Sequence, residues 1–226
     1  MPKPWELPLY EFELPRRKIV VNVTRSCPTF AVPAPGVADV AAELKKKGQT
    51  KVLDFGAGKL RNALYLLGKG FQVWAVEFKD CFQTPAGERF LTQAEGYKKF
   101  FLKKWPDEFL EWDFDVDAVF LINVANVVPE EADRRRIVAE CIKRLRSGGS
   151  FYWMSQYGEP YYKPAVTKRL RAPDGGWFYS LDKSYQTYYR EFQIPEIMTY
   201  FDATRFQQPP RRIVAAHHRA FLFEKR

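Results

Sequence analysis

The chain has 226 residues, of which 46% are hydrophobic and 16% aromatic; this allows one sizeable core and excludes a disordered chain. Lys and Arg outnumber Asp and Glu by 36 to 27, and the formal charge of +9 suits a polyanionic partner, although the basic residues are scattered. Three cysteines without a CxxC spacing and two histidines exclude a disulfide framework and predict no metal site.

The amino-terminal sequence lacks the apolar stretch of a signal peptide, and no apolar run is long enough to cross a bilayer. We therefore expect a cytoplasmic protein that does not bind membranes. Nothing in the sequence predicts an oligomeric state.

The chain is predicted to have an amino-terminal arm at residues 1–36 and one domain at 37–226. The arm is rich in Pro and aromatic residues, shows no helical period and contains a candidate strand at Lys18–Val23. The domain begins with apolar residues at helical spacing from Val37 to Leu44, which predicts a helix.

Strands and helices then alternate. The predicted strands are Lys51–Phe55, Gln72–Phe78, Asp117–Asn123 and Ser150–Met154, and the predicted helices are 61–67, 85–104 and a helix opened by Pro129 and closed by Gly148-Gly149. Alternation of this kind predicts an α/β fold with a mostly parallel, doubly wound sheet. The carboxyl-terminal region, with candidate strands at 205–214 and 216–224, predicts an antiparallel hairpin.

The alternation of strands and helices is interrupted at about residues 157–193. This segment is rich in Tyr and contains the turn signal Pro173-Asp174-Gly175-Gly176. It is predicted to be a hairpin insertion. Its aromatic residues are interleaved with Lys and Arg, a mixture that suits stacking on bases beside phosphates, or a lid that packs on the sheet.

The most informative segment runs from Val52 to Asn62, between a strand and a helix. Gly56 and Gly58 allow a tight turn and close approach of a ligand, and the helix behind them offers free N–H groups. Asp54 ends the strand before the turn, and Glu77 ends the next strand, where a carboxylate is placed to bind ribose hydroxyls. This spacing predicts a nucleoside-containing cofactor.

These residues resemble the first motif of class I S-adenosylmethionine-dependent methyltransferases, an apolar strand followed by D/E-x-G-x-G-x-G. Asp54, Gly56 and Gly58 match it, whereas Leu60 stands in place of the last glycine. A dinucleotide G-x-G-x-x-G is not matched, because Arg61 replaces its third glycine. The resemblance implies a seven-stranded sheet that ends in the antiparallel hairpin.

The resemblance implies S-adenosyl-L-methionine as the cofactor, with Asp54 near its amino-acid part and Glu77 on its ribose. The full set of predicted cofactor-binding residues is Asp54, Phe55, Gly56, Ala57, Gly58, Asn62, Glu77, Phe78 and Asn123. The family's third strand is expected around Phe109–Trp112, with Glu111 or Asp113 near the adenine.

Acceptors bind beyond the carboxyl ends of the strands in open α/β folds. The residues predicted there as acceptor-binding are Asn126, Gln156, Tyr157, Tyr161 and Tyr162. The segment from Asn123 to Pro129 lacks the D/N-P-P-Y/F motif of enzymes that methylate base amines, and no Pro-Cys dipeptide provides a cytosine nucleophile. No catalytic residue is predicted.

Three functions stay open at this point. The first is a methyltransferase acting on a nucleic acid, another anionic acceptor or a small molecule. The second is a catalytically silent protein with the cofactor fold that serves as an RNA- or partner-binding subunit. The third, a nucleotide-dependent oxidoreductase, is disfavoured by the missing glycine and the final hairpin.

Overall fold

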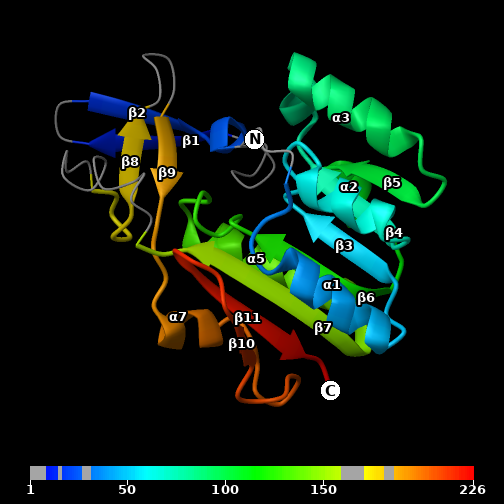
Figure 1. Ribbon diagram of the computed structural model, residues 1–226. Coiled ribbons are helices and arrows are strands. Elements are labelled where there is room, and N and C mark those ends of the chain that lie inside the picture. The colour runs from blue at the N-terminus through cyan, green and yellow to red at the C-terminus, as the bar shows by residue number, and fades with distance from the viewer. Residues whose placement is uncertain (1–8, 15–16, 27–31, 159–170, 181–185) are drawn as a thin grey trace.

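Figure 1 shows the computed structural model of the chain. The structure describes residues 9–14, 17–26, 32–158, 171–180 and 186–226. Two β-sheets and the helices around them make up this part of the chain.

The larger, central sheet has seven strands in the order β10-β11-β7-β6-β3-β4-β5. Their bounds are Lys51–Phe55 for β3, Gln72–Glu77 for β4, Phe100–Lys104 for β5, Val116–Ile122 for β6, Leu145–Gln156 for β7, Arg211–Ile213 for β10 and His218–Glu224 for β11. Strands β5, β4, β3, β6 and β7 pair in parallel, and β11 runs antiparallel to both β7 and β10. The predicted seven-stranded, mostly parallel sheet with its carboxyl-terminal antiparallel hairpin is confirmed.

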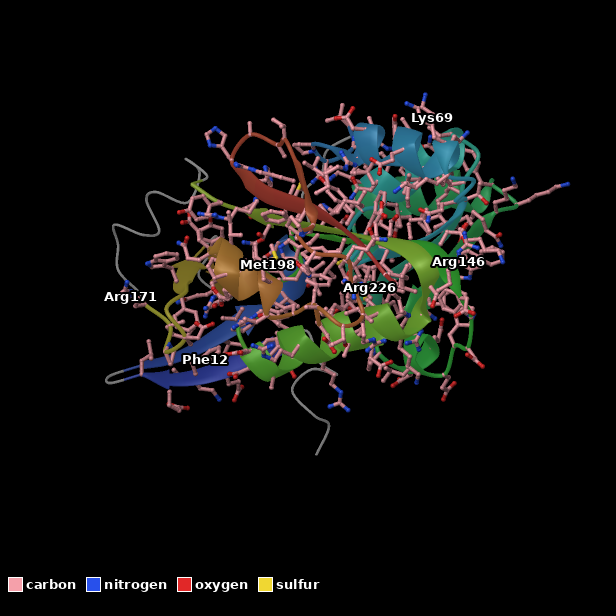
Figure 2. All side chains as sticks on the ribbon, turned by 90° about the horizontal axis from the view of Figure 1, so that it is seen from below. Phe12, Lys69, Arg146, Arg171, Met198 and Arg226 are labelled. Carbon is pink, nitrogen blue, oxygen red and sulfur yellow. The ribbon has the colours of Figure 1, made fainter. Side chains whose placement is uncertain are left out.

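Helices cover both faces of the central sheet, as Figure 1 shows. One face carries α1 (Val37–Lys46), α2 (Arg61–Gly68) and α3 (Pro85–Glu95), and the other carries α4 (Asp107–Leu110), α5 (Glu131–Arg144) and α7 (Ile194–Met198). The described residues also contain two short 3-10 helices, η2 (Val23–Ser26) and η3 (Lys79–Phe82). Apolar side chains fill the layers on both sides of the sheet, which the view of Figure 2 makes visible.

Two predicted boundaries are wrong because β-pairing overrides local pattern. The helix predicted over 85–104 ends at Glu95, and Phe100–Lys104 instead forms β5 beside β4. The third strand expected at Phe109–Trp112 therefore lies earlier, and Phe109 belongs to α4. Phe109 is buried against Phe55 and Trp105, so its apolar character reflects helix packing rather than a strand.

A third correction concerns the end of α5. This helix stops at Arg144, and β7 begins immediately at Leu145, so Gly148-Gly149 lies within the strand rather than at a helix end. A Cβ on Gly149 would lie 2.9 Å from the carbonyl oxygen of Asp117, so the glycine permits close contact with β6.

The smaller, second sheet combines strands of the amino-terminal arm with strands of the insertion. Its strands are β1 (Leu9–Leu14), β2 (Arg17–Asn22), β8 (Trp177–Ser180) and β9 (Gln186–Tyr189), in the order β1-β2-β9-β8. The hairpin predicted in the insertion is thus β8–β9, and it pairs through β9 with β2 of the arm. In Figure 1 this sheet lies beyond the ends toward which β6 and β7 point.

Candidate functional site

Alternation along two neighbouring strands places both predicted acids on one face of the central sheet. On β3, Val52 packs toward α1 and α2 and Leu53 toward α5, so Asp54 returns to the α2 side. On β4 the same alternation turns Glu77 to that side. Because β3 and β4 are adjacent and parallel, the two carboxyl groups meet at the same edge.

The turn after β3 has the backbone geometry that glycine favours. Gly56 and Gly58 have φ values of 69° and 55°, in the left-handed region. A Cβ on Gly56 would lie 2.3 Å from Cγ2 of Val124, in the loop after β6. The backbone N–H groups of Gly56 and Ala57 both donate to the carbonyl oxygen of Val76, which fixes the turn against β4.

Leu60 explains how the chain departs from the family's motif. It caps α2 with φ 64°, a left-handed conformation that costs a non-glycine residue about 1–2 kcal/mol. Its side chain is fully buried in the core beneath α1 and α2. Burial of this apolar side chain therefore offsets the strain of the left-handed conformation.

Glu77 is buried and accepts hydrogen bonds from three donors. Its Oε2 accepts from the N–H of Gly58 at 2.6 Å and its Oε1 from the N–H of Phe78 at 2.8 Å. The thiol of Cys81 donates to the same carboxylate. Burial raises the pKa of Glu77, and these donors act in the opposite direction.

Asp54 has far fewer partners. It is 1% exposed, the N–H of Ala63 donates to it, and its Oδ2 has no hydrogen-bond partner within the described chain. Burial, and then the neighbouring carboxylate of Glu77, raise the pKa of Asp54 to about 7, against an opposing effect of Arg61 in the first turn of α2. An unsatisfied buried carboxyl oxygen at the end of a strand is a position suited to a cationic ligand group.

The other predicted cofactor residues near this turn differ in their burial and in their contacts. Phe55 is packed between Trp105 and Phe109, and Ala57 is buried. Phe78 is half-buried beside Glu77. The amide oxygen of Asn62 accepts from the N–H of Ala34 at 2.9 Å and so ties the end of the arm to α2.

Asn123 directly follows β6 and has a left-handed conformation, with φ 57°. Its N–H donates to the carbonyl oxygen of Met154 on β7, and its side-chain Oδ1 is buried without a partner in the described residues. Its position at the carboxyl edge, beside the strand that carries Asp54, leaves this oxygen available to a ligand.

Asn126 is fully buried, and backbone groups engage its side-chain amide. Its Oδ1 accepts from the N–H of Gln156 at 2.9 Å, and its Nδ2 donates to the carbonyl oxygens of Gln156 and Arg190. The N–H of Arg190 donates back to the carbonyl oxygen of Asn126 at 3.0 Å. Asn126 therefore joins the end of β7 to the chain that leaves β9.

Tyr157 follows β7 at the same edge and stacks on a cation from β11. The guanidinium carbon of Arg219 lies 3.7 Å from the Tyr157 ring centroid, and Arg219 donates to Oε1 of Gln193 at 3.1 Å. Hydrogen bonds with Gln193 and Arg219 lower the pKa of Tyr157. Tyr161 and Tyr162, also predicted here, lie outside the described residues.

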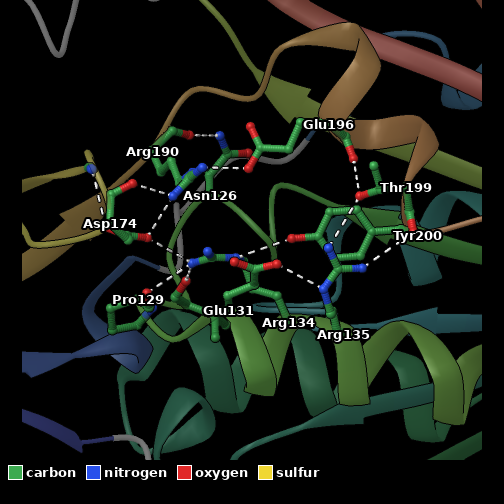
Figure 3. Close-up of polar contacts among 12 residues, drawn as sticks. Asn126, Pro129, Glu131, Arg134, Arg135, Asp174, Arg190, Glu196, Thr199 and Tyr200 are labelled. Atoms are coloured by element: carbon green, nitrogen blue, oxygen red, sulfur yellow. Dashed lines mark hydrogen bonds and ion pairs between the residues drawn. The ribbon is translucent and has the colours of Figure 1, made fainter.

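Sequence reasoning did not find a polar network next to this edge, shown in Figure 3. Asp174, in the turn before β8, accepts hydrogen bonds from Arg134 of α5, from Tyr188 of β9 and from Arg190. Arg190 also pairs with Glu196 of α7. The only signal in the sequence was the Pro173-Asp174-Gly175-Gly176 turn, which gives no indication of a partner 40 residues away.

The described part of the chain contains no group of three or more His, Cys, Asp or Glu side chains that could hold a metal ion. Within the same residues, no helix combines the length and apolar character required to span a bilayer.

Comparison with solved structures identifies the fold as the Rossmann-like methyltransferase fold. The 1,6-didemethyltoxoflavin-N1-methyltransferase of Burkholderia thailandensis, crystallised with that compound and S-adenosylhomocysteine, is 20% identical, with 84% of this chain and 78% of that chain covered and a TM-score of 0.58. The glycopeptide N-methyltransferase MtfA with S-adenosyl-L-homocysteine is 14% identical, with coverages of 86% and 92% and a TM-score of 0.59.

A SAM-dependent methyltransferase from Methanosarcina mazei is 18% identical, with 77% of this chain and 92% of that chain covered and a TM-score of 0.57. No protein-family model matches the chain, and no curated protein matches it. At these identities the likeness establishes the fold alone.

Proposed function

We propose that this chain is a S-adenosylmethionine-dependent methyltransferase. The observation that carries the proposal is the pair of buried carboxyl groups, Asp54 and Glu77, on one face of two adjacent strands beside a turn with left-handed glycines. Similar structures contain S-adenosylmethionine or its demethylated product, which supports this cofactor.

The residues at the turn fit such a cofactor in chemical type. Glu77 would accept hydrogen bonds from the ribose hydroxyls, because it is a buried carboxylate whose two oxygens can accept more bonds than its backbone donors supply. Asp54 would pair with the α-ammonium group, because its Oδ2 is buried and bare. The side-chain oxygen of Asn123 would accept a hydrogen bond from the amino-acid part of the cofactor.

When bound, the cofactor would supply an electrophilic methyl carbon on a sulfonium, from which the lone pair of the acceptor would displace the neutral sulfide in line as the C–S bond breaks. The task of the protein is then to align the acceptor and to keep water out. Asn126 joins the end of β7 to the chain that leaves β9, and Gln156 and Tyr157 would line the acceptor side of that edge. Asn126 is on this account a positioning residue, because its amide groups already bind the backbone.

We infer a small-molecule or peptide acceptor in preference to a nucleic acid. Among the described residues near the acceptor edge the charges balance, because the cations Arg134, Arg190 and Arg219 lie among the anions Asp174, Glu191 and Glu196. A phosphate backbone requires uncompensated cations. Two of the similar enzymes are a 1,6-didemethyltoxoflavin-N1-methyltransferase and a glycopeptide N-methyltransferase, which supports a nitrogen acceptor.

Calorimetric titration with S-adenosylhomocysteine tests the cofactor. We expect micromolar binding by the intact chain and binding weakened by about 1.5–3 kcal/mol in Glu77→Gln, because charged hydrogen bonds are lost. Glu95→Gln, an exposed site at the end of α3, is the matched control and should bind normally. Absence of binding by the intact chain would overturn the proposal.

Methyl transfer is then measured with methyl-labelled cofactor against panels of nitrogen heterocycles, peptides and nucleic acids. Transfer of the labelled methyl group to nitrogen heterocycles or to peptides supports the inferred acceptor. Label in the nucleic-acid panel alone, at moderate salt, would show that the acceptor class is wrong while leaving the methyltransferase reaction in place.

A further inference from the structure

The two carboxyl groups of the site differ sharply in how many hydrogen bonds they accept. Glu77 receives two backbone N–H groups and a thiol, whereas Asp54 receives the N–H of Ala63 and keeps a bare Oδ2. Both groups are more than nine-tenths buried. Two close carboxylates in a poorly solvated site repel one another, so the group with fewer donors holds a proton most readily.

The surroundings of Asp54 contain few other charges. Adjacent β4 contributes Glu77, and α2 contributes Arg61, whose own pKa burial lowers and Asp54 raises. On β6, the register partner of Asp54 is the apolar Phe120. Burial and Glu77 raise the pKa of Asp54 to about 7, so near neutral pH its carboxyl group is partly protonated in the ligand-free protein.

We propose that Asp54 loses its proton when the α-ammonium group of the cofactor binds, so that cofactor binding releases a proton, and that Arg61 sets the pH range of this exchange. The inference rests on the proposed function, because it requires the cofactor at this turn. The ammonium group keeps its own protons, the O–H bond of Asp54 breaks, and that proton passes to solvent. No covalent bond to the ligand forms.

A definite pH profile follows from this coupling. Below the ligand-free pKa of Asp54, each bound molecule must first displace a proton, so affinity for S-adenosylhomocysteine falls about tenfold per pH unit. Above that pKa the affinity is constant until the ligand's ammonium group itself deprotonates. 5′-Methylthioadenosine, which has the nucleoside but no amino-acid group, should bind with a flat profile over the same range.

Calorimetry in two buffers of different ionisation enthalpy, phosphate and Tris, measures the released proton directly. At pH 7 we expect release of about half a proton per molecule of S-adenosylhomocysteine and none with 5′-methylthioadenosine. Asp54→Asn should abolish the release and weaken S-adenosylhomocysteine about tenfold to a hundredfold, with little change for 5′-methylthioadenosine.

Asp117→Asn is the matched control, because Asp117 is also a buried carboxyl, accepts from the N–H groups of Thr50 and Lys51, and belongs to the opposite edge of the sheet. It should release the same proton as the unaltered chain. Arg61→Gln should raise the release toward one proton at pH 7, since Arg61 lowers the pKa of Asp54, whereas Arg61→Lys should leave it nearly unchanged.

The outcomes separate this inference from the proposed function. Equal heats in the two buffers, with S-adenosylhomocysteine bound normally, would overturn the proton exchange and leave the cofactor site standing. Proton release that persists in Asp54→Asn would assign it to another group and would also overturn the inference. If neither S-adenosylhomocysteine nor 5′-methylthioadenosine binds, the proposed function and this inference fail together.

Discussion

Arg134 and Asp174 form an ion pair, with 3.2 Å between Nη1 and Oδ2, that holds the second sheet against the central domain. The Arg134 side chain is completely buried and also donates to the carbonyl oxygens of Val128 and Pro129. The preceding residue, Asp133, accepts a hydrogen bond from the hydroxyl of Tyr10 on β1. The first turn of α5 thus binds both hairpins of the second sheet.

Removing one member of this pair should be costly. We expect Asp174→Asn to lower the free energy of unfolding by about 3–5 kcal/mol, because the completely buried guanidinium of Arg134 is left without its carboxylate. Arg134→Met should cost about 2 kcal/mol, because Asp174 keeps Arg190 and Tyr188 as partners but the carbonyl oxygens that accepted from Arg134 lose their donor. Urea unfolding monitored by tryptophan fluorescence measures the change. Arg135→Gln is the control: its exposed ion pair with Glu131 should be worth less than about 1 kcal/mol. Equal effects at 134 and 135 would contradict the assigned role.

Variants of Leu60 separate the backbone strain at this residue from the stabilisation that its buried side chain provides. Replacement by Ala removes the buried side chain and keeps the left-handed strain, whereas replacement by Gly removes both. We expect both variants to be destabilised, with Leu60→Gly more stable than Leu60→Ala by about 1 kcal/mol. Chemical denaturation of the two variants measures the difference. If Leu60→Ala is instead more stable than Leu60→Gly, the backbone at residue 60 is not held in this conformation.

Gly56 and Gly48 share a φ of 69° but differ in their surroundings. A Cβ on Gly56 meets Val124 at 2.3 Å, whereas nothing lies within 4 Å of one on Gly48. Gly48→Ala should therefore cost only the strain of about 1–2 kcal/mol, and Gly56→Ala a further 1–3 kcal/mol for the clash. Thermal unfolding compares the two, and Gly56→Ala should also lose binding of S-adenosylhomocysteine. Equal stability losses would mean that the Gly56–Val124 contact relaxes freely.

The raised pKa of Asp54 predicts how stability changes with pH. In the unfolded chain Asp54 ionises near its ordinary pKa, whereas the folded chain holds the proton up to about pH 7. The folded state binds the proton more tightly, so the contribution of Asp54 to stability is lost as pH rises toward 7 and stays low above it.

Asp54→Asn removes this titration. Its stability relative to the unaltered chain should rise by about 2.5 kcal/mol between pH 5 and pH 8, measured by denaturant unfolding without ligand. The exposed Glu95→Gln variant should show no such trend. A stability difference that is the same at both pH values would indicate that Asp54 is already ionised at pH 5.

The sequence by itself determined those strands and turns that depend only on residues close together in the chain. Continuous apolar runs predicted β3 and β6, and the spacing from Asp54 through Gly56 to Glu77 placed the turn between two parallel strands. These predictions hold because alternation along a strand and glycine in a turn are set by neighbouring residues.

Only the tertiary structure decided the rest, because it depends on contacts between distant segments. Phe100–Lys104 has no strong strand pattern of its own and becomes β5 by pairing with β4. The arm forms a sheet with the insertion through the pairing of Val21 with Gln186. The match between Arg134 and Asp174 likewise has no local signature, since the burial that makes this ion pair important exists only after the chain has folded.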